Sequence, residues 1–212
     1  MLIICGSRLS FAASSIDIRG EYENWETDLG GSSNSPMFGL GLTADLDKNW
    51  LFSGGVSLGK FSLANETIDL NRTDIDIGVA RTILQRLNIF TGYRLSSLNV
   101  NNKLDATANF EEFTHGLGLG VGSHVQLLQN LYSYGRLSFG ALYSVSQSDV
   151  QQNFSGFGYS SGVEAGLVYP FNPKTILNIN AKYQKNVINY KKSDGTWSHS
   201  YFRIGLSVSR QF

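Results

Sequence analysis

Two carboxylates separated by one residue, Asp74 and Asp76, are the strongest candidates for catalytic chemistry in this sequence. Residues i and i+2 of an extended strand point to the same face, so the two carboxylates would lie side by side. An acidic pair can polarise a water molecule for hydrolysis when a histidine assists it. The alternative is that each carboxylate forms an ion pair with Arg94 or Arg136, and we favour this structural role.

The three histidines do not complete a catalytic site. His115 and His124 have opposite parity in one strand-like segment and His199 lies far along the chain, so no zinc-binding spacing occurs. No Asp-x-His triplet is present, and the nearest acid–histidine pair is Asp194 with His199. We therefore predict no enzyme, no metal and no cofactor.

Composition excludes several further classes of protein. The 17 basic and 17 acidic residues cancel, and the largest basic cluster is Lys191-Lys192, so a nucleic-acid partner is not expected. No stretch approaches the roughly 18 apolar residues of a transmembrane helix, so any membrane crossing must use strands. The 23 glycines and only 3 prolines are typical of long paired strands. The single cysteine, Cys5, leaves no disulfide to form.

The segment 1–13 is apolar and ends in Ser10-Phe11-Ala12, the small-x-small form of a signal-peptidase site. No basic residue precedes its apolar run and Arg8 interrupts it. We interpret it as an atypical or truncated signal segment, followed by a single domain over 14–212.

From residue 16 onward the sequence alternates apolar and polar residues in segments separated by turn-forming residues. The clearest segment is 114–122, where Leu117, Leu119 and Val121 share one face and glycine occupies the positions between them. Ten such segments can be counted, although eight or twelve remain alternatives. Short turns alternate with longer connections, which we expect at 26–35, 62–72, 98–112, 147–156 and 186–199. This rhythm predicts an all-β fold, a single antiparallel up-and-down transmembrane β-barrel.

The two faces of the predicted strands differ in a way that indicates which one meets lipid. Small residues and charges of both signs share the polar face, which fits a crowded, largely filled lumen better than a water-exposed exterior rich in lysine and glutamate. The predicted lumen network comprises Asp17, Arg19, Glu21, Asp45, Asp74, Asp76, Arg94, Arg136, Glu164, Lys182 and Arg203, and Glu23 is assigned to the same polar face. The apolar face would carry two aromatic girdles, with Trp50, Tyr169 and Phe212 in one and Phe61, Tyr143, Phe157, Tyr159 and Phe202 in the other.

The last strand-like segment ends on an aromatic residue. Its apolar positions share one face, and these are Phe202, Ile204, Leu206, Val208 and Phe212. The ending resembles the closing strand of bacterial outer-membrane β-barrels, and the chain after residue 15 resembles the small OmpA-like and opacity-like porin-family group. The resemblance implies an outer-membrane location with both termini in the periplasm, contact with lipid and lipopolysaccharide, and recognition by the barrel assembly machinery.

Three hypotheses for function follow. The leading one is a non-enzymatic outer-membrane protein with a structural or surface-binding, adhesin-like role. An extracellular ligand would meet Tyr190, Lys191, Lys192 and Trp197 in the last long connection, whose aromatic and basic residues suit a sugar or lipopolysaccharide. The alternative is a narrow, weakly cation-leaning porin. The third is a hydrolase resembling the omptins, ten-stranded outer-membrane proteases that use an acidic pair, although the accompanying Asp–His pair is missing here.

Overall fold

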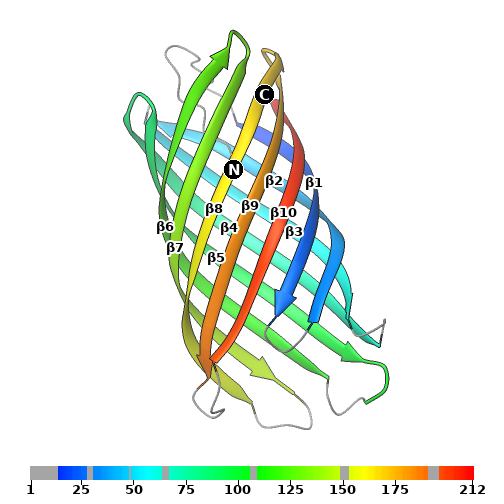
Figure 1. Cartoon of the computed structure of the whole chain (residues 1–212). Helices are drawn as coiled ribbons and strands as arrows, with labels where there is room; N and C mark the ends of the chain where they lie inside the picture. The colour runs from blue at the N-terminus through cyan, green and yellow to red at the C-terminus, as the bar shows by residue number, and fades with distance from the viewer. Residues whose placement is uncertain are drawn as a thin grey trace.

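The computed structural model describes residues 14–27, 31–47, 49–63, 67–105, 109–148, 153–190 and 196–212, and these form a closed barrel of ten antiparallel strands (Figure 1). The strands are β1 (Ser15–Thr27), β2 (Gly31–Asp47), β3 (Trp50–Leu63), β4 (Ile68–Leu84), β5 (Leu87–Asn102), β6 (Phe110–Leu128), β7 (Leu131–Gln147), β8 (Phe154–Asn172), β9 (Thr175–Tyr190) and β10 (Thr196–Gln211). Each strand pairs with its neighbours in sequence, and β1 pairs with β10 to close the sheet. The predicted ten-stranded up-and-down barrel is confirmed. Among the described residues no helix is long and apolar enough to span a membrane.

The two ends of the barrel differ in their connections. At one end, which we call the turn end, short turns join β2 to β3, β4 to β5, β6 to β7 and β8 to β9. The C-terminus lies at this end (Figure 1), where the Gln211 N–H donates to the Lys174 carbonyl and the Phe212 N–H to the Ser14 carbonyl. We call the opposite end, where the other five connections lie, the loop end. The predicted signal segment 1–13, with Cys5, lies outside the described residues.

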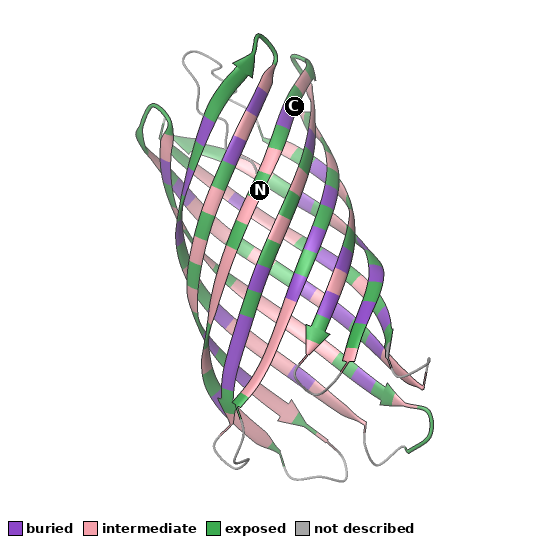
Figure 2. Cartoon of the chain, viewed as in Figure 1, coloured by how far each residue is buried: buried purple, intermediate pink, exposed green. Residues whose placement is uncertain are grey.

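A broad band of apolar side chains covers the outside of the barrel. Exposed and less exposed residues alternate along each strand because successive side chains point to opposite faces (Figure 2). Leu117 and Leu119 on β6 are each 65% exposed, and Phe139 on β7 is 61% exposed. A water-soluble protein would bury such a continuous apolar surface, whereas the core of a bilayer accommodates it.

The strands extend further toward the loop end than the sequence pattern predicts. All five predicted long connections are partly strand, because β2 begins at Gly31, β4 at Ile68, β6 at Phe110, β8 at Phe154 and β10 at Thr196. The backbone ladder continues there while the polarity of the two faces reverses. Leu70 of β4 points inward and is buried, while Asn71 points outward and is exposed. We call these loop-end parts of the strands, where apolar side chains point inward and polar ones outward, the collar.

The apolar core of the protein lies inside the collar. The buried cluster consists of Trp25, Met37, Phe61, Leu70, Val100 and Tyr201. Phe61, which we expected in an outward girdle, is instead 2% exposed and packs in this cluster. The prediction was wrong because the reversal of polarity turns apolar residues inward beyond the lipid-facing band.

Candidate functional site

The inside of the barrel is the candidate functional site, because most of the charged strand residues point into it. Ten of the eleven predicted network residues line one internal cavity, and the eleventh, Asp74, is buried beside it. Ion pairs that join strands across the lumen divide this interior into two parts.

Arg203 of β10 is the centre of the first group of ion pairs. Its Nε donates to Glu23 Oε2 at 2.7 Å, and its Nη1 donates to Glu21 Oε2 at 2.8 Å. Its Nη2 also lies 3.5 Å from Asp74 Oδ2. The guanidinium stands 5.1 Å from the centroid of the Tyr201 ring, within cation–π range.

Arg72 of β4 holds the same carboxylates from the other side. Its Nη1 donates to Glu23 Oε1 at 2.8 Å and its Nε to Asp74 Oδ1 at 3.0 Å. The Ser96 hydroxyl also donates to Asp74, at 2.6 Å. Arg72 lies 4.8 Å from the Tyr201 ring centroid, so that ring is flanked by two guanidinium groups. We call Glu21, Glu23, Arg72, Asp74, Tyr201 and Arg203 together the plug.

The apolar cluster of the collar packs directly against the plug, since Tyr201 belongs to both. Toward the loop end, the Trp197 ring contacts Phe110 and Tyr190, with centroid distances of 6.2 and 5.9 Å. The plug and these apolar layers occupy the loop-end half of the lumen among the described residues.

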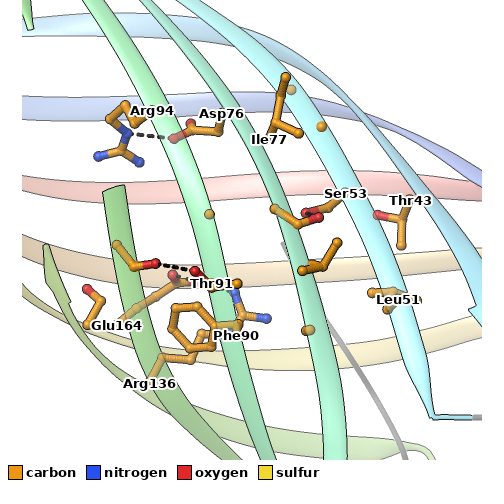
Figure 3. Close-up of a pocket in the computed structure, with 18 of the residues that line it drawn as sticks. Thr43, Leu51, Ser53, Asp76, Ile77, Phe90, Thr91, Arg94, Arg136 and Glu164 are labelled. Atoms are coloured by element: carbon orange, nitrogen blue, oxygen red, sulfur yellow. Dashed lines mark hydrogen bonds and ion pairs between the residues drawn. The ribbon is translucent and has the colours of Figure 1, made fainter. Parts of the chain in front are cut away.

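Asp76, the partner of Asp74 in the predicted acidic pair, belongs to a different contact. It accepts a hydrogen bond from Arg94 Nε at 2.6 Å, as Figure 3 shows. Arg94 Nη1 reaches across the lumen to the Tyr201 hydroxyl at 2.8 Å and to Gln184 Oε1 at 2.9 Å. Each carboxylate therefore stabilises an arginine and no shared catalytic dyad forms.

The histidines lie apart from these carboxylates. His115 hydrogen-bonds the Tyr93 hydroxyl on the outer face, and His199 contacts Asn186 and the Trp25 ring in the collar. His124 is buried in β6 close to its turn end. Among the described residues no group of three or more His, Cys, Asp or Glu side chains is arranged to hold a metal ion.

The turn-end half of the lumen holds a cavity of about 820 Å³ (Figure 3). On its wall Glu164 accepts hydrogen bonds from the Tyr134 hydroxyl at 2.7 Å and from Asn180 Nδ2 at 3.2 Å. Arg136 lies 3.8 Å from Glu164, and its guanidinium stands 5.9 Å from the Phe90 ring centroid. The cavity exists because glycines of β6, such as Gly118, present no side chain to it.

Two of the predicted loop-binding residues, Tyr190 and Trp197, point into the loop end of the barrel. The Tyr190 hydroxyl donates to Ser144 Oγ at 3.1 Å, and Trp197 Nε1 donates to Thr27 Oγ1 at 3.2 Å. Lys191 and Lys192 lie outside the described residues. The predicted C-terminal assembly residues point outward, with exposed fractions from 41% at Val208 to 71% at Phe212.

Sequence reasoning missed two charged residues of the lumen, Arg72 and Glu112. Arg72 was assigned to a connection, although its spacing of two from Asp74 places it on the same strand face. Glu112 is 3% exposed and accepts hydrogen bonds from the Ser144 and Thr114 hydroxyls at 2.8 and 3.1 Å. It too lies in the stretch 98–112, which was predicted as a connection.

Comparison with known proteins supports the architecture alone. No family model matches the sequence, and no curated protein matches it. Among solved structures, the outer membrane protease OmpT from Escherichia coli is similar with a TM-score of 0.63 and 8% identity, covering 96% of this chain and 98% of that one. The β domain of the Bordetella autotransporter BrkA has a TM-score of 0.58 and 9% identity, with 94% and 100% covered. The translocator domain of the autotransporter NalP from Neisseria meningitidis has a TM-score of 0.54 and 12% identity, with 96% and 90% covered. The chain therefore has the fold of the bacterial outer-membrane β-barrel proteins.

Proposed function

We propose that this protein is a non-conducting, non-enzymatic integral outer-membrane barrel that acts in a structural or surface-binding role. The observation that carries the proposal is the plug, which joins β1, β4 and β10 across the lumen through buried ion pairs. The turn end and both termini face the periplasm, and the collar stands outside the membrane on the cell surface.

The two surface zones support this placement. At the level of the lipid-facing band, the side chains on the outer face of the barrel are apolar and those facing the lumen are polar, as a bilayer requires. The collar has the opposite arrangement, with Asn34 and Asn71 exposed and Met37 and Leu70 buried, as water requires. The collar therefore presents the five loop-end connections to an extracellular partner.

The plug argues against a porin. A hydrated ion would have to separate Arg203 from Glu23, which is 0% exposed, and then pass the buried Met37 and Phe61. Stranding one partner of a buried ion pair costs about 3–5 kcal/mol. Thermal opening of this closure is correspondingly rare.

The plug argues equally against a hydrolase. OmpT is named a protease, but here Asp74 is 2% exposed and bound by Arg72 and Ser96, so it has no access to a substrate. Asp76 is held by Arg94. Asp76 is exposed in the cavity, but among the described residues no histidine is bound to it to assist in activating water.

Two kinds of partner follow from the outer surface. The apolar band contacts lipid and, on the cell-surface side, lipopolysaccharide. The outward row of β10 that ends at Phe212 is available for recognition by the barrel assembly machinery, because all of its apolar side chains are exposed.

Planar-bilayer recording tests the proposal. Purified refolded protein should give no unitary conductance steps, whereas the double variant Phe61→Gly/Tyr201→Gly, with two large side chains removed from the closure, should give them. Regular steps from the unmodified protein would refute the closed lumen. A gel position that does not change on boiling, together with solubility in the absence of detergent, would refute the membrane assignment.

A further inference from the structure

We propose that the turn-end cavity is a binding site for a small zwitterion of the size and chemistry of a short peptide. At about 820 Å³ the cavity falls within the range of small-molecule sites. Its lining includes Asp45, Asn49 and Gln211, which place its mouth at the turn end, and Arg203 of the plug, which closes it at the other.

Lys182 of β9 supplies the positive end of the site. Lys182 lines the cavity, and its Nζ stands 5.7 Å from the centroid of the Tyr201 ring. Within the described part of the chain no carboxylate lies within ion-pair distance of Lys182. Its strand neighbour Glu164 is engaged by Arg136, Tyr134 and Asn180. Glu164 and Asp76 interact electrostatically with Lys182 only from beyond ion-pair distance, and a ligand carboxylate would give Lys182 a direct ion-pair partner.

Asp76 supplies the negative end of the site, where a ligand ammonium would bind. The side chain of Asp76 is 42% exposed in the cavity, and Arg94 binds its Oδ1. Its Oδ2 accepts no hydrogen bond from the described residues, whereas the amide oxygen of Asn178 on the same wall is fully buried and is not reached from the cavity. A ligand ammonium that reaches Asp76 Oδ2 would therefore form a charge-assisted hydrogen bond there.

The polar lining of the cavity suits the backbone of a peptide. Hydroxyl and amide groups of Ser138, Ser160 and Asn180 line the same cavity as Lys182 and Asp76, and such groups suit peptide N–H and carbonyl groups. A simple anion would satisfy Lys182 and leave Asp76 Oδ2 without a donor.

Isothermal titration calorimetry of the detergent-folded protein with tri-alanine tests the site. Tri-alanine should bind, and its N-acetylated, C-amidated form should bind at least tenfold more weakly. Lys182→Met should weaken tri-alanine binding at least tenfold. Lys185→Met is the matched control, because Lys185 is on the same strand but exposed on the outer face, and it should leave binding unchanged.

A second variant tests the cavity without altering a charge. A Cβ at Gly118 would have no atom nearer than 3.5 Å, so Gly118→Phe should place its ring in the cavity and abolish binding. Gel mobility before and after boiling verifies that each variant is folded. Absence of heat with tri-alanine, equal binding by the Lys182 and Lys185 variants, or full binding by Gly118→Phe would each overturn the inference. The assay involves no bilayer, so it is independent of the conductance result.

Discussion

Replacing Arg203 with methionine should destabilise the barrel more than any surface charge replacement. The methionine keeps an apolar stem of similar length beside Tyr201 but removes the donors to Glu21 and Glu23. Three carboxylates, of Glu21, Glu23 and Asp74, then face one guanidinium instead of two. Glu23 is 0% exposed, so water cannot replace the lost partner.

Arg203→Met should lower the free energy of unfolding by about 3–5 kcal/mol, the range for removing one partner of a buried ion pair. The matched control is Lys60→Met. Its ion pair with Asp69 spans 3.5 Å with the lysine side chain 65% exposed, and such surface pairs contribute at most about 1 kcal/mol.

Reversible urea unfolding in lipid vesicles, followed by tryptophan fluorescence, measures both costs. Adding Glu23→Gln to Arg203→Met should recover part of the lost free energy of unfolding, because it removes the stranded charge. A cost below about 1 kcal/mol for Arg203→Met would refute the reasoning, as would a double variant less stable than the single one.

Three further predictions concern other parts of the barrel. Leu119→Arg, in the middle of the lipid-facing band, should cost about 2–4 kcal/mol in the same unfolding assay. Gly120→Ala should cost about 1–3 kcal/mol because its Cβ would overlap the Phe90 ring and the Leu137 carbonyl oxygen, whereas Gly118→Ala should change stability by less than about 0.5 kcal/mol. Asp69 lies in the collar beyond the lipid-facing band, and the hydrogen bond with Lys103 lowers the pKa of its carboxyl. The ion pair therefore supports the folded state above the unfolded-state pKa and is lost as the pH falls; Lys103→Met should raise the pKa of Asp69 in an NMR titration, and an unchanged pKa would contradict the assignment.

The sequence was sufficient to predict the barrel, its ten strands and the orientation of its two faces within the lipid-facing band. It was insufficient in the collar, because alternation was read there with a single polarity. Ile68-Asp69-Leu70-Asn71-Arg72 alternates as regularly as any other strand, but its apolar residues point inward. A pattern of period two identifies a strand without indicating which face meets water.

The pairing of the lumen charges was predictable only in part. Arg94 and Asp76 occupy facing positions on adjacent strands, and the expected pair forms. Asp74 pairs instead with Arg72, two residues away on its own strand, and with Arg203 from β10. The second contact depends on how the closed barrel brings distant strands across the lumen, which spacing along one strand does not reveal.

The plug also has a consequence for the kinetics of folding and opening. Arg203 and Glu23 are 180 residues apart in sequence, but they occupy facing positions in the β1–β10 pair. Their bond can form only when the first and last strands meet. It therefore stabilises the last step of barrel closure, which joins residues far apart in the sequence. Once formed, it acts as a latch on the seam, because parting β1 from β10 would expose Glu21, Glu23 and Arg203 together. The slowest motion of this barrel should therefore be the opening of that seam.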